Sequence, residues 1–266
     1  MPEIHATAIV DPAARLAEDV RVGPFCCIGP EVELAQGVVL ESHVAVAGRT
    51  SIGARTRLFP FASIGHAPQD LKYGGETSRL EIGSDNAIRE HVTMNPGTEG
   101  GGMVTRVGDG CLFMVGAHVA HDCQVGDRVI LANNATLAGH VVIEEGAIIG
   151  GLSAIHQFVR IGRNAMIGGM SGVERDVVPF ALVQGERAGL VGLNLVGLRR
   201  AGLTGEQIRR LQKLLDEVYA DTGTLAERRD SLEASVGAAG DGAGPAAELL
   251  RFVFAPSQRG LCRPTG

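Results

Sequence analysis

The sequence predicts a solenoid of short β-strands followed by a small helical region. Three observations carry this prediction: an apolar residue recurs at every sixth position, aromatic side chains are scarce, and a helical pattern begins only after Pro179. The 266 residues include 38 Gly, no Trp and 2 Tyr, which is typical of thin repeated layers rather than of a core filled by large rings.

The six-residue period of apolar side chains runs from Val10 to Ile64, resumes at Ile82, and after a shift of one residue continues from Val107 to Val173. The residue after the apolar one is often Gly, and the residue two positions before it is small or β-branched. A period of six fits neither an α-helix nor a plain alternating strand. It indicates a chain that turns a corner every six residues around a narrow core, with glycine supplying backbone freedom.

Three such repeats would close a triangular coil of 18 residues, with neighbouring coils about 4.8 Å apart. The period is interrupted near 66–79 and 95–106, which we expect to be external loops. Because Ile64 and Ile82 are 18 residues apart, the first loop is predicted to replace one coil without losing phase. The second loop contains Gly100-Gly101-Gly102 and is predicted to be flexible.

Residues 1–185 are predicted to form the solenoid and residues 186–266 a C-terminal helical domain. An apolar face recurs at helical spacing from Ile208 to Val218. Two capping-box pairs each indicate the start of a helix. A proline after a Gly/Ala-rich linker indicates the start of a last helix at 246–254. These signals are Thr204 with Gln207, Thr224 with Glu227, the linker 237–244, and Pro245.

Charge and cysteine content restrict the class of protein. A net charge of −6 argues against nucleic acid as a partner, since phosphate neutralisation needs clustered Lys and Arg. The 5 cysteines form no C-x-x-C pair and indicate a reducing compartment. No basic and apolar leader opens the chain, and no apolar stretch is long enough to span a membrane. We therefore expect a cytoplasmic protein without a transmembrane segment.

The 18-residue coil converts sequence spacing into distance, because residues one coil apart lie above one another. His121 should then lie above Gly139, and Asp122 above His140. One further coil on, His121 meets Gln157. The predicted cluster on one edge of the solenoid comprises His118, His121, Asp122, His140, His156 and Gln157.

A histidine beside a carboxylate is typical of a general base, since the carboxylate fixes the tautomer and stabilises the imidazolium. A backbone N–H at Gly139 could hold a developing oxyanion. No serine or cysteine is placed as a covalent nucleophile. These features favour acyl transfer by direct attack of a hydroxyl.

Two alternatives remain open at this stage. Imidazoles from stacked coils could bind zinc. The offsets among His121, His140 and His156 are 19, 16 and 35 residues, not multiples of 18, which makes a tight three-histidine set less natural. The polar residues could instead be solvent-facing corner residues of a non-catalytic scaffold or binding solenoid.

Four stretches carry a resemblance to a known family: 23–26, 69–73, 133–140 and 156–158. Together they closely resemble the UDP-N-acetylglucosamine 3-O-acyltransferases, a hexapeptide-repeat family, and the resemblance covers essentially the whole chain. It implies an all-β left-handed parallel β-helix with a C-terminal α-helical domain, assembled as a homotrimer with active sites between subunits. It also implies transfer of an (R)-3-hydroxyacyl chain from acyl carrier protein to UDP-N-acetylglucosamine, the first step of lipid A synthesis, without a cofactor or metal.

The resemblance also implies roles for individual residues. His121 matches the general base, Asp122 its partner, and Gly139 the backbone donor to the oxyanion. Gly169 matches the position that bounds the acyl chain, and Asn194 with Arg200 matches positions that hold the nucleotide. The other matches to substrate-contacting positions are Gln69, Asp70, Lys72, His118, His140, His156 and Gln157.

The chain departs from the family pattern at Asn95 in the outer loop and at Arg187, Val196 and Ala201 in the nucleotide-facing segment. A 3-amino sugar, which some relatives use as acceptor, remains an alternative. A related N-acyltransferase that acts later in the same pathway carries an additional N-terminal uridine-binding domain. The repeats here begin at Val10, which leaves no room for that domain and favours the O-acyltransferase.

Overall fold

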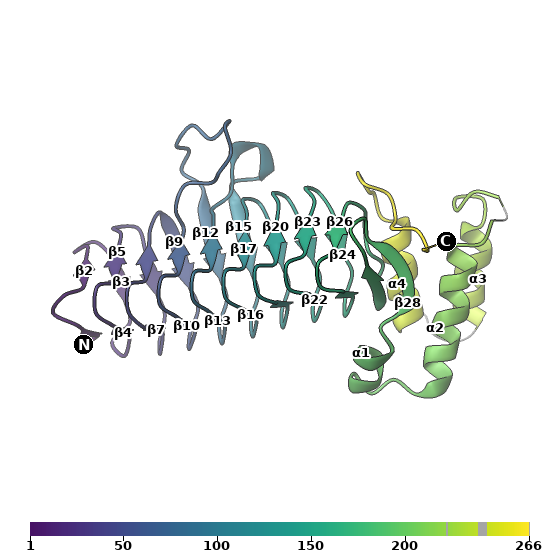
Figure 1. Cartoon of the computed structure of the whole chain (residues 1–266), viewed down its shortest axis with the longest axis horizontal. Helices are drawn as coiled ribbons and strands as arrows, with labels where there is room; N and C mark the ends of the chain where they lie inside the picture. The colour runs from purple at the N-terminus through teal and green to yellow at the C-terminus, as the bar shows by residue number, and fades with distance from the viewer. Residues whose placement is uncertain (222, 239–243, 266) are drawn as a thin grey trace.

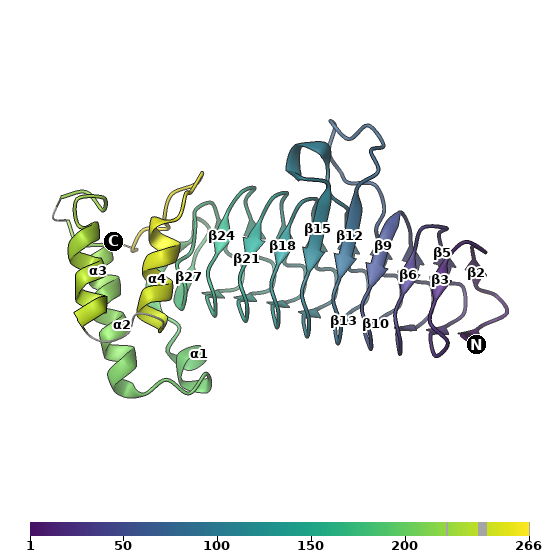
Figure 2. The same ribbon diagram turned by 180° about the vertical axis from the view of Figure 1, so that it is seen from behind.

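The computed structural model describes residues 1–221, 223–238 and 244–265. Short parallel strands stack into three sheets that form the faces of a long prism, with the helices gathered at its C-terminal end (Figures 1 and 2). Strand pairs such as Glu3 with Arg21 and His118 with Thr136 join neighbouring coils in the predicted register.

As far as β26, successive strands fall on the three faces in turn, and β27 and β28 both join the first face. The first face contains β1 (Glu3–Ile4), β4 (Arg21–Val22), β7 (Val39–Leu40), β10 (Arg57–Leu58), β13 (Ala87–Ile88), β16 (Leu112–Phe113), β19 (Ile130–Leu131), β22 (Ile148–Ile149), β25 (Met166–Ile167), β27 (Ala181–Gln184) and β28 (Gly189–Leu193). The second contains β2 (Ile9–Val10), β5 (Cys27–Ile28), β8 (Ala45–Val46), β11 (Ser63–Ile64), β14 (Thr93–Met94), β17 (His118–Val119), β20 (Thr136–Leu137), β23 (Ala154–Ile155) and β26 (Gly172–Val173). The third contains β3 (Arg15–Leu16), β6 (Glu33–Leu34), β9 (Arg49–Ile52), β12 (Arg79–Ile82), β15 (Val104–Val107), β18 (Gln124–Val125), β21 (Val142–Ile143) and β24 (Arg160–Ile161).

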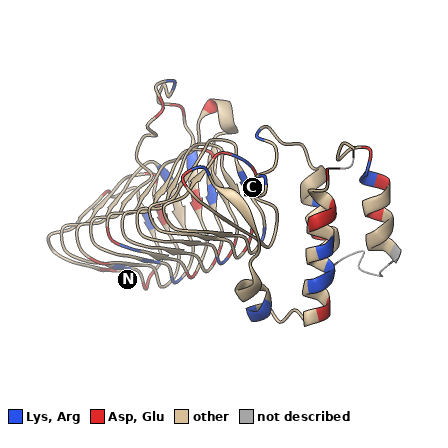
Figure 3. Ribbon diagram, turned by 45° about the vertical axis from the view of Figure 1, so that its right-hand side comes forward, with Lys and Arg blue, Asp and Glu red and all other residues tan. Residues whose placement is uncertain are grey.

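The apolar residue of each repeat points into the prism, as the period predicted. Leu58, Ile88 and Leu131 are fully buried, and burial of each such side chain stabilises the fold by about 1.5–3 kcal/mol. Outside the core, arginines and glutamates of neighbouring coils pair on the surface, for example Arg49 with Glu31, so that basic and acidic residues alternate along the prism (Figure 3).

Most glycines that follow the apolar residues do not adopt left-handed backbone, although Gly65 (φ 79°) does, as predicted. Several corner residues that adopt left-handed backbone are not glycine, among them Phe25 (φ 59°) and His43 (φ 58°). Gly23 is needed for another reason, because a Cβ there would lie 1.9 Å from the carbonyl oxygen of Glu41. At this position glycine allows close approach between coils, and the prediction that it supplies backbone freedom is wrong.

The two predicted loops project from the same edge of the prism (Figure 1). The first joins β11 to β12, and the second joins β14 to β15 and contains a 3₁₀ turn, η1 (Glu99–Gly101). The prediction that the first loop replaces one coil is wrong. Ile52 pairs directly with Ile82, and Arg55 meets Asp85 30 residues on. The loop is therefore an insertion that lengthens a single coil.

The β27–β28 hairpin closes the prism with an antiparallel pair. The predicted division between residues 185 and 186 falls in the turn of this hairpin, so β28 pairs with the sheet rather than joining the helices. The helices are α1 (Leu195–Arg200), α2 (Gly205–Val218), α3 (Arg229–Ala238) and α4 (Pro245–Phe254). Within the described parts of the chain, no helix combines the length and apolar character needed to cross a membrane.

The helix signals in the sequence hold with small shifts. Thr204 and Gln207 form the predicted capping box of α2, and Pro245 is the first residue of α4. Thr224 and Glu227 exchange the two hydrogen bonds of a capping box, although α3 itself begins at Arg229. The start predicted for the linker, residue 237, is too early, since α3 continues to Ala238. Residues 239–243 of the predicted linker lie outside the described parts of the chain.

Candidate active site

His121 and Asp122 form a buried pair at the corner that follows β17. Nδ1 of His121 lies 2.8 Å from Oδ2 of Asp122. An ionised carboxylate can only accept a hydrogen bond, so Nδ1 carries the proton and donates it. The second ring nitrogen, Nε2, then has a free lone pair and can act as a general base.

The carboxylate of Asp122 is fixed from a second side by the loop between β14 and β15. The N–H of Thr98 donates to Oδ1 at 2.9 Å, and the Thr98 hydroxyl donates to Oδ2 at 2.6 Å. The Asp122 N–H in turn donates to Oγ1 of Thr105 at 2.7 Å. Sequence reasoning missed both Thr98, in this loop, and Thr105, in β15, because only a break in the period marked the segment 95–106.

Gly139 lies directly against the ring of His121, as the coil length predicted. The His140 N–H donates to the His121 carbonyl at 3.0 Å, which fixes the two coils in register. A Cβ on Gly139 would lie 2.4 Å from Cε1 of His121. Among the described residues the Gly139 N–H has no hydrogen-bond acceptor, so it is free to donate to a bound group beside the imidazole.

His140 extends the site along the same edge. Its ring meets that of His121 edge-on at 5.0 Å and stacks on Phe158 at 4.4 Å. Burial lowers the pKa of His140, an effect that the nearby Asp122 carboxylate opposes. The imidazole is therefore held toward its neutral form, in which one ring nitrogen can donate and the other accept.

His118 lies on β17, just before the corner that carries His121 and Asp122. It hydrogen-bonds through Nδ1 to Oγ1 of Thr93 at 2.7 Å. Burial lowers the pKa of His118, and a positive charge on His121 lowers it further. The structure thus brings four of the predicted residues together around the imidazole of His121: His118, Asp122, Gly139 and His140.

Two histidines and one aspartate also form a set that could hold a divalent metal ion. One ligand atom each from His121, Asp122 and His140 lies within 4.8 Å of the others. The three-histidine set considered from the sequence would have included His156, which this group does not contain. Both oxygens of Asp122 already accept hydrogen bonds from Thr98, so a metal would compete with these donors.

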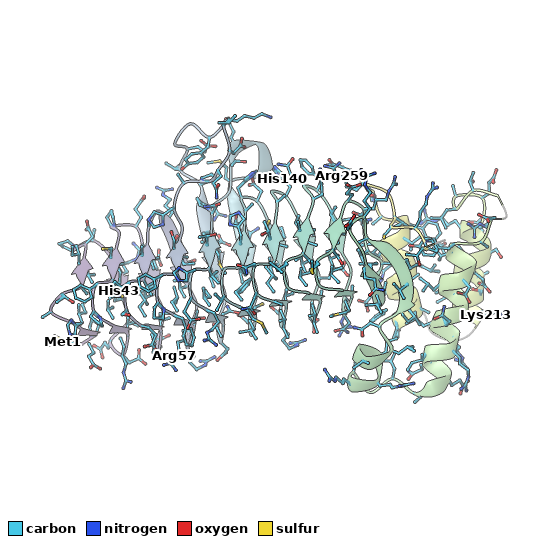
Figure 4. All side chains as sticks on the ribbon, viewed as in Figure 1. Met1, His43, Arg57, His140, Lys213 and Arg259 are labelled. Atoms are coloured by element: carbon cyan, nitrogen blue, oxygen red, sulfur yellow. The ribbon has the colours of Figure 1, made fainter. Side chains whose placement is uncertain are left out.

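His156 and Gln157 lie one coil further along and are exposed. The Gln157 carbonyl accepts a hydrogen bond at 2.7 Å from Nε of Arg259, whose guanidinium lies 6.0 Å from the Phe158 ring centre. His140 and Arg259 follow one another along the same edge of the prism in Figure 4. Arg259 was missed from the sequence because only the tertiary fold returns the C-terminal segment to this edge.

Gln69 and Lys72 are exposed on the loop between β11 and β12, while Asp70 is half-buried. The Asp70 carboxylate accepts the Lys72 N–H at 3.0 Å. The charges of Asp70 and Lys72 both influence His140, so this loop contributes to the electrostatics of the histidine cluster.

The remaining predicted residues lie toward the C-terminal end of the prism. Asn194 caps α1 by accepting the Gly197 N–H at 3.0 Å, and it donates to the carbonyl of Asn164. Arg200 is exposed at the end of α1, which lies away from β17 in Figure 1. Gly169 is exposed beside the carbonyl of Gly151. A single chain does not gather these three residues around His121.

Comparison with known proteins identifies the family. Residues 176–262 match the family model described as UDP N-acetylglucosamine O-acyltransferase, domain 2, and residues 105–139 match the bacterial transferase hexapeptide model. An acyl-[acyl-carrier-protein]–UDP-N-acetylglucosamine O-acyltransferase from Thermodesulfovibrio yellowstonii is 46% identical over 99% of this chain and 100% of its own length. The chain belongs to the UDP-N-acetylglucosamine O-acyltransferase family.

Other members of the O-acyltransferase family agree in sequence and in structure. The relative from Azorhizobium caulinodans is 49% identical over 97% of this chain and 96% of its own length. The solved LpxA structure from Acinetobacter baumannii superposes with a TM-score of 0.92 at 41% identity, covering 98% of this chain and 99% of that chain. The Arabidopsis UDP-N-acetylglucosamine acyltransferase superposes with a TM-score of 0.84 at 35% identity, covering 98% of this chain and 100% of that chain. The predicted left-handed β-helix and the predicted family are both confirmed.

Proposed function

We propose that this chain transfers an (R)-3-hydroxyacyl group from acyl carrier protein to the 3-hydroxyl of UDP-N-acetylglucosamine, the first step of lipid A biosynthesis. The relatives that match the whole chain are named for this acyl transfer. The structural observation that carries the proposal is the buried His121–Asp122 pair, whose imidazole lies against Gly139, a residue whose N–H has no acceptor among the described residues. This arrangement provides a base and an oxyanion donor side by side.

In the proposed reaction, Nε2 of His121 takes the proton of the sugar 3-hydroxyl as that oxygen attacks the thioester carbonyl. The new C–O bond forms while the carbonyl electrons move onto oxygen, and the Gly139 N–H donates to this oxyanion. Collapse of the tetrahedral intermediate breaks the C–S bond and expels the carrier-protein thiolate. The thiolate then takes the proton from the His121 imidazolium, which Asp122 has stabilised.

Substrate contacts are assigned around this centre. Asp70 and Lys72 are proposed to bind the sugar end of the acceptor, with Gln69 beside them and with His118 and His140 lining the site. His156 and Gln157 continue the edge along which the acyl chain would lie, and Gly169 is proposed to bound that chain. Asn194 and Arg200 are proposed to hold the nucleotide.

We propose a homotrimer with active sites between subunits. In support, aromatic rings at successive corners form an exposed column. The ring centres of Phe25, His43, Phe61 and His91 lie 4.9, 4.9 and 5.1 Å apart, with the first pair tilted and the other two stacked. Phe25 is 56% exposed and Phe61 52%, so burial of this column would favour association. Sedimentation equilibrium tests the proposal, and a monomer at micromolar concentration would contradict it.

A cytoplasmic location is part of the same proposal. All five cysteines, which lie in the described residues, are free thiols rather than disulfides, which fits a reducing compartment. The acyl-carrier-protein donor named for the relatives would have to be available in that compartment. Cell fractionation with an antibody to the chain tests this location, and recovery in a membrane pellet after a salt wash would contradict it.

A transfer assay in EDTA tests the function. Purified protein is mixed with UDP-N-acetylglucosamine and 3-hydroxyacyl carrier proteins of several chain lengths, and mass spectrometry identifies the product. We expect an O-acylated nucleotide sugar, and we expect His121→Ala to lower turnover about 100-fold or more, the usual scale for a general base. Near-full activity of that variant would contradict the assigned base.

Three other outcomes of this assay separate the alternatives. Acylation of a 3-amino UDP-sugar alone would move the acceptor from a hydroxyl to an amine without changing the site. Turnover that EDTA abolishes and zinc restores would favour metal chemistry at His121, Asp122 and His140, whose ligand atoms lie within 4.8 Å of one another. A folded protein that acylates neither acceptor under any of these conditions would favour a scaffold.

A further inference from the structure

Within the second loop, the segment from Thr98 to Gly101 contacts the carboxylate of Asp122, the proposed partner of the base. We propose that Thr98 and Gly101 are positioning residues, which hold the Asp122 carboxylate so that it orients His121 for proton transfer. This inference rests on the proposed function, because it assigns the loop a role only if His121 is the general base. It also revises the prediction that this glycine-rich loop is simply flexible.

Thr98 meets Asp122 through two separate donors. Its N–H reaches Oδ1 at 2.9 Å and its hydroxyl reaches Oδ2 at 2.6 Å, the same oxygen that accepts Nδ1 of His121 at 2.8 Å. All three residues are buried, with exposed fractions of 5% for Thr98, 4% for Asp122 and 7% for His121. Charge-assisted hydrogen bonds in a buried setting are short and directional. Rotation of the carboxylate would break the bond to His121.

Gly101 covers the other side of the carboxylate. A Cβ at Gly101 would lie 1.9 Å from Cγ of Asp122 and 2.2 Å from its Oδ2. The turn that brings it there is closed by the Gly101 N–H, which donates to the Thr98 carbonyl at 3.1 Å. Any side chain at this position must therefore displace Asp122 or lift the loop. By contrast, a Cβ at the neighbouring Gly100 would meet nothing within 4 Å.

Contacts with the first loop hold the second loop in place. Nδ2 of Asn95 donates to the carbonyl of His66 at 3.0 Å, and the Glu99 N–H donates to the Glu76 carboxylate at 3.2 Å. The first loop also carries Asp70 and Lys72, which influence His140. The loop is therefore anchored to the first loop at Asn95, before the Thr98–Gly101 segment, and at Glu99 within it, and it can act as a fixed support for Asp122.

Paired substitutions at Thr98 test the inference. Thr98→Val keeps the shape but removes the hydroxyl donor, and we expect kcat to fall about tenfold or more with little change in KM for the sugar nucleotide. Thr98→Ser keeps the hydroxyl and should restore kcat to within about threefold of the wild type, on the same scale. Thr56→Val removes a hydroxyl that is also buried but bonds only within the core, and it should leave kcat per folded protein unchanged.

Glycine substitutions provide a second test that does not depend on Thr98. Gly101→Ala should lower kcat at least as strongly as Thr98→Val, whereas Gly100→Ala should have wild-type turnover. Thermal unfolding verifies that each variant is folded. Should Thr98→Val fail to fold, the comparison of Gly101→Ala with Gly100→Ala decides alone. Equal activity of these two alanine variants would overturn the inference.

A double-variant cycle distinguishes action through Asp122 from an independent effect. If Thr98 acts through the carboxylate, adding Thr98→Val to Asp122→Asn should cause no further loss, and multiplying losses would contradict this. The two levels of proposal fail differently. A folded wild-type protein that acylates neither acceptor removes the proposed function, and retained activity of His121→Ala removes the assigned base on which the inference rests. An inactive His121→Ala alongside a fully active Thr98→Val removes only the positioning role.

Discussion

The α-carbon of Gly139 faces the ring of His121 so closely that an added Cβ would lie 2.4 Å from Cε1 and 2.6 Å from Nε2. This contact joins the proposed base to the proposed oxyanion donor across one coil. It leaves room for hydrogen at this position and for nothing larger.

Gly139→Ala should therefore abolish most turnover, because the methyl group displaces the imidazole from the unpaired backbone N–H. We expect a loss of about 100-fold or more in kcat, the scale of a lost oxyanion donor. Gly29→Ala is the matched control, since a Cβ at Gly29 would meet its nearest atom at an ordinary 3.5 Å. Initial-rate assays on both proteins check the prediction, which fails if Gly139→Ala matches Gly29→Ala.

Asp122→Asn should lower kcat about 100-fold or more while the fold is retained. An amide can donate to Nδ1 of His121 as well as accept from it, so the proton can move to Nε2 and remove the base. Steady-state kinetics should show the loss mainly in kcat, and nuclear magnetic resonance of the imidazole nitrogens should show the changed tautomer. An unchanged tautomer with unchanged kcat would argue that Asp122 has no part in the reaction.

Gly169→Met should shorten the acyl chain that the enzyme accepts, if Gly169 bounds that chain as proposed. The residue is exposed, and a Cβ would lie 3.3 Å from the carbonyl oxygen of Gly151, so a long side chain must project outward from the edge. We expect long 3-hydroxyacyl donors to lose about tenfold in kcat/KM, the scale of one or two blocked methylenes. Competition between donors of different length measures this. An unchanged ranking would place the end of the chain elsewhere.

Stability should fall as the solution becomes acidic. Burial lowers the pKa of both His118 and His140 from the ordinary value of 6.5. Between the lowered folded value and 6.5 the unfolded chain binds more protons, so the free energy of unfolding rises with pH in that window. The destabilisation is absent above 6.5 and complete below the folded pKa values. Urea midpoints from pH 5 to pH 8 should follow this course, with a shallower slope for His118→Gln; an identical slope would exclude His118 as a source.

Substitution of the buried Asp176 should strongly lower the stability of the fold. It is fully buried, and its carboxylate accepts Nε of Arg160 at 2.7 Å and the Arg160 N–H at 2.8 Å. Asp176→Ala leaves the largely buried guanidinium without its partner and should lower the free energy of unfolding by about 3 kcal/mol. Asp85→Ala removes an exposed pair with Arg55 and should change the urea midpoint little. Equal midpoints for the two variants would contradict the prediction.

The sequence predicted the architecture well because the repeat is a local constraint applied many times. Every sixth residue must be apolar for each coil to bury its inner face, so the period reports both the core and the coil length. The same coil length placed Gly139 against His121 and His140 near Asp122. The period could not predict the conformation of the two loops, where the period is interrupted. Thr98 and Gly101 lie in such a break, and nothing in their spacing indicates that they contact Asp122.

By itself the sequence determined the solenoid, its helical end, the family and the histidine–aspartate pair, since these follow from periodic burial and from short motifs. Only the tertiary structure decided that the first loop lengthens one coil, that Gly23 serves close approach between coils, and that Arg259 returns to the site edge. The physical reason is the range of the interactions. The same apolar position is buried in every coil, so its period shows in the sequence. A single hydrogen bond between distant segments depends instead on the path of the whole intervening chain.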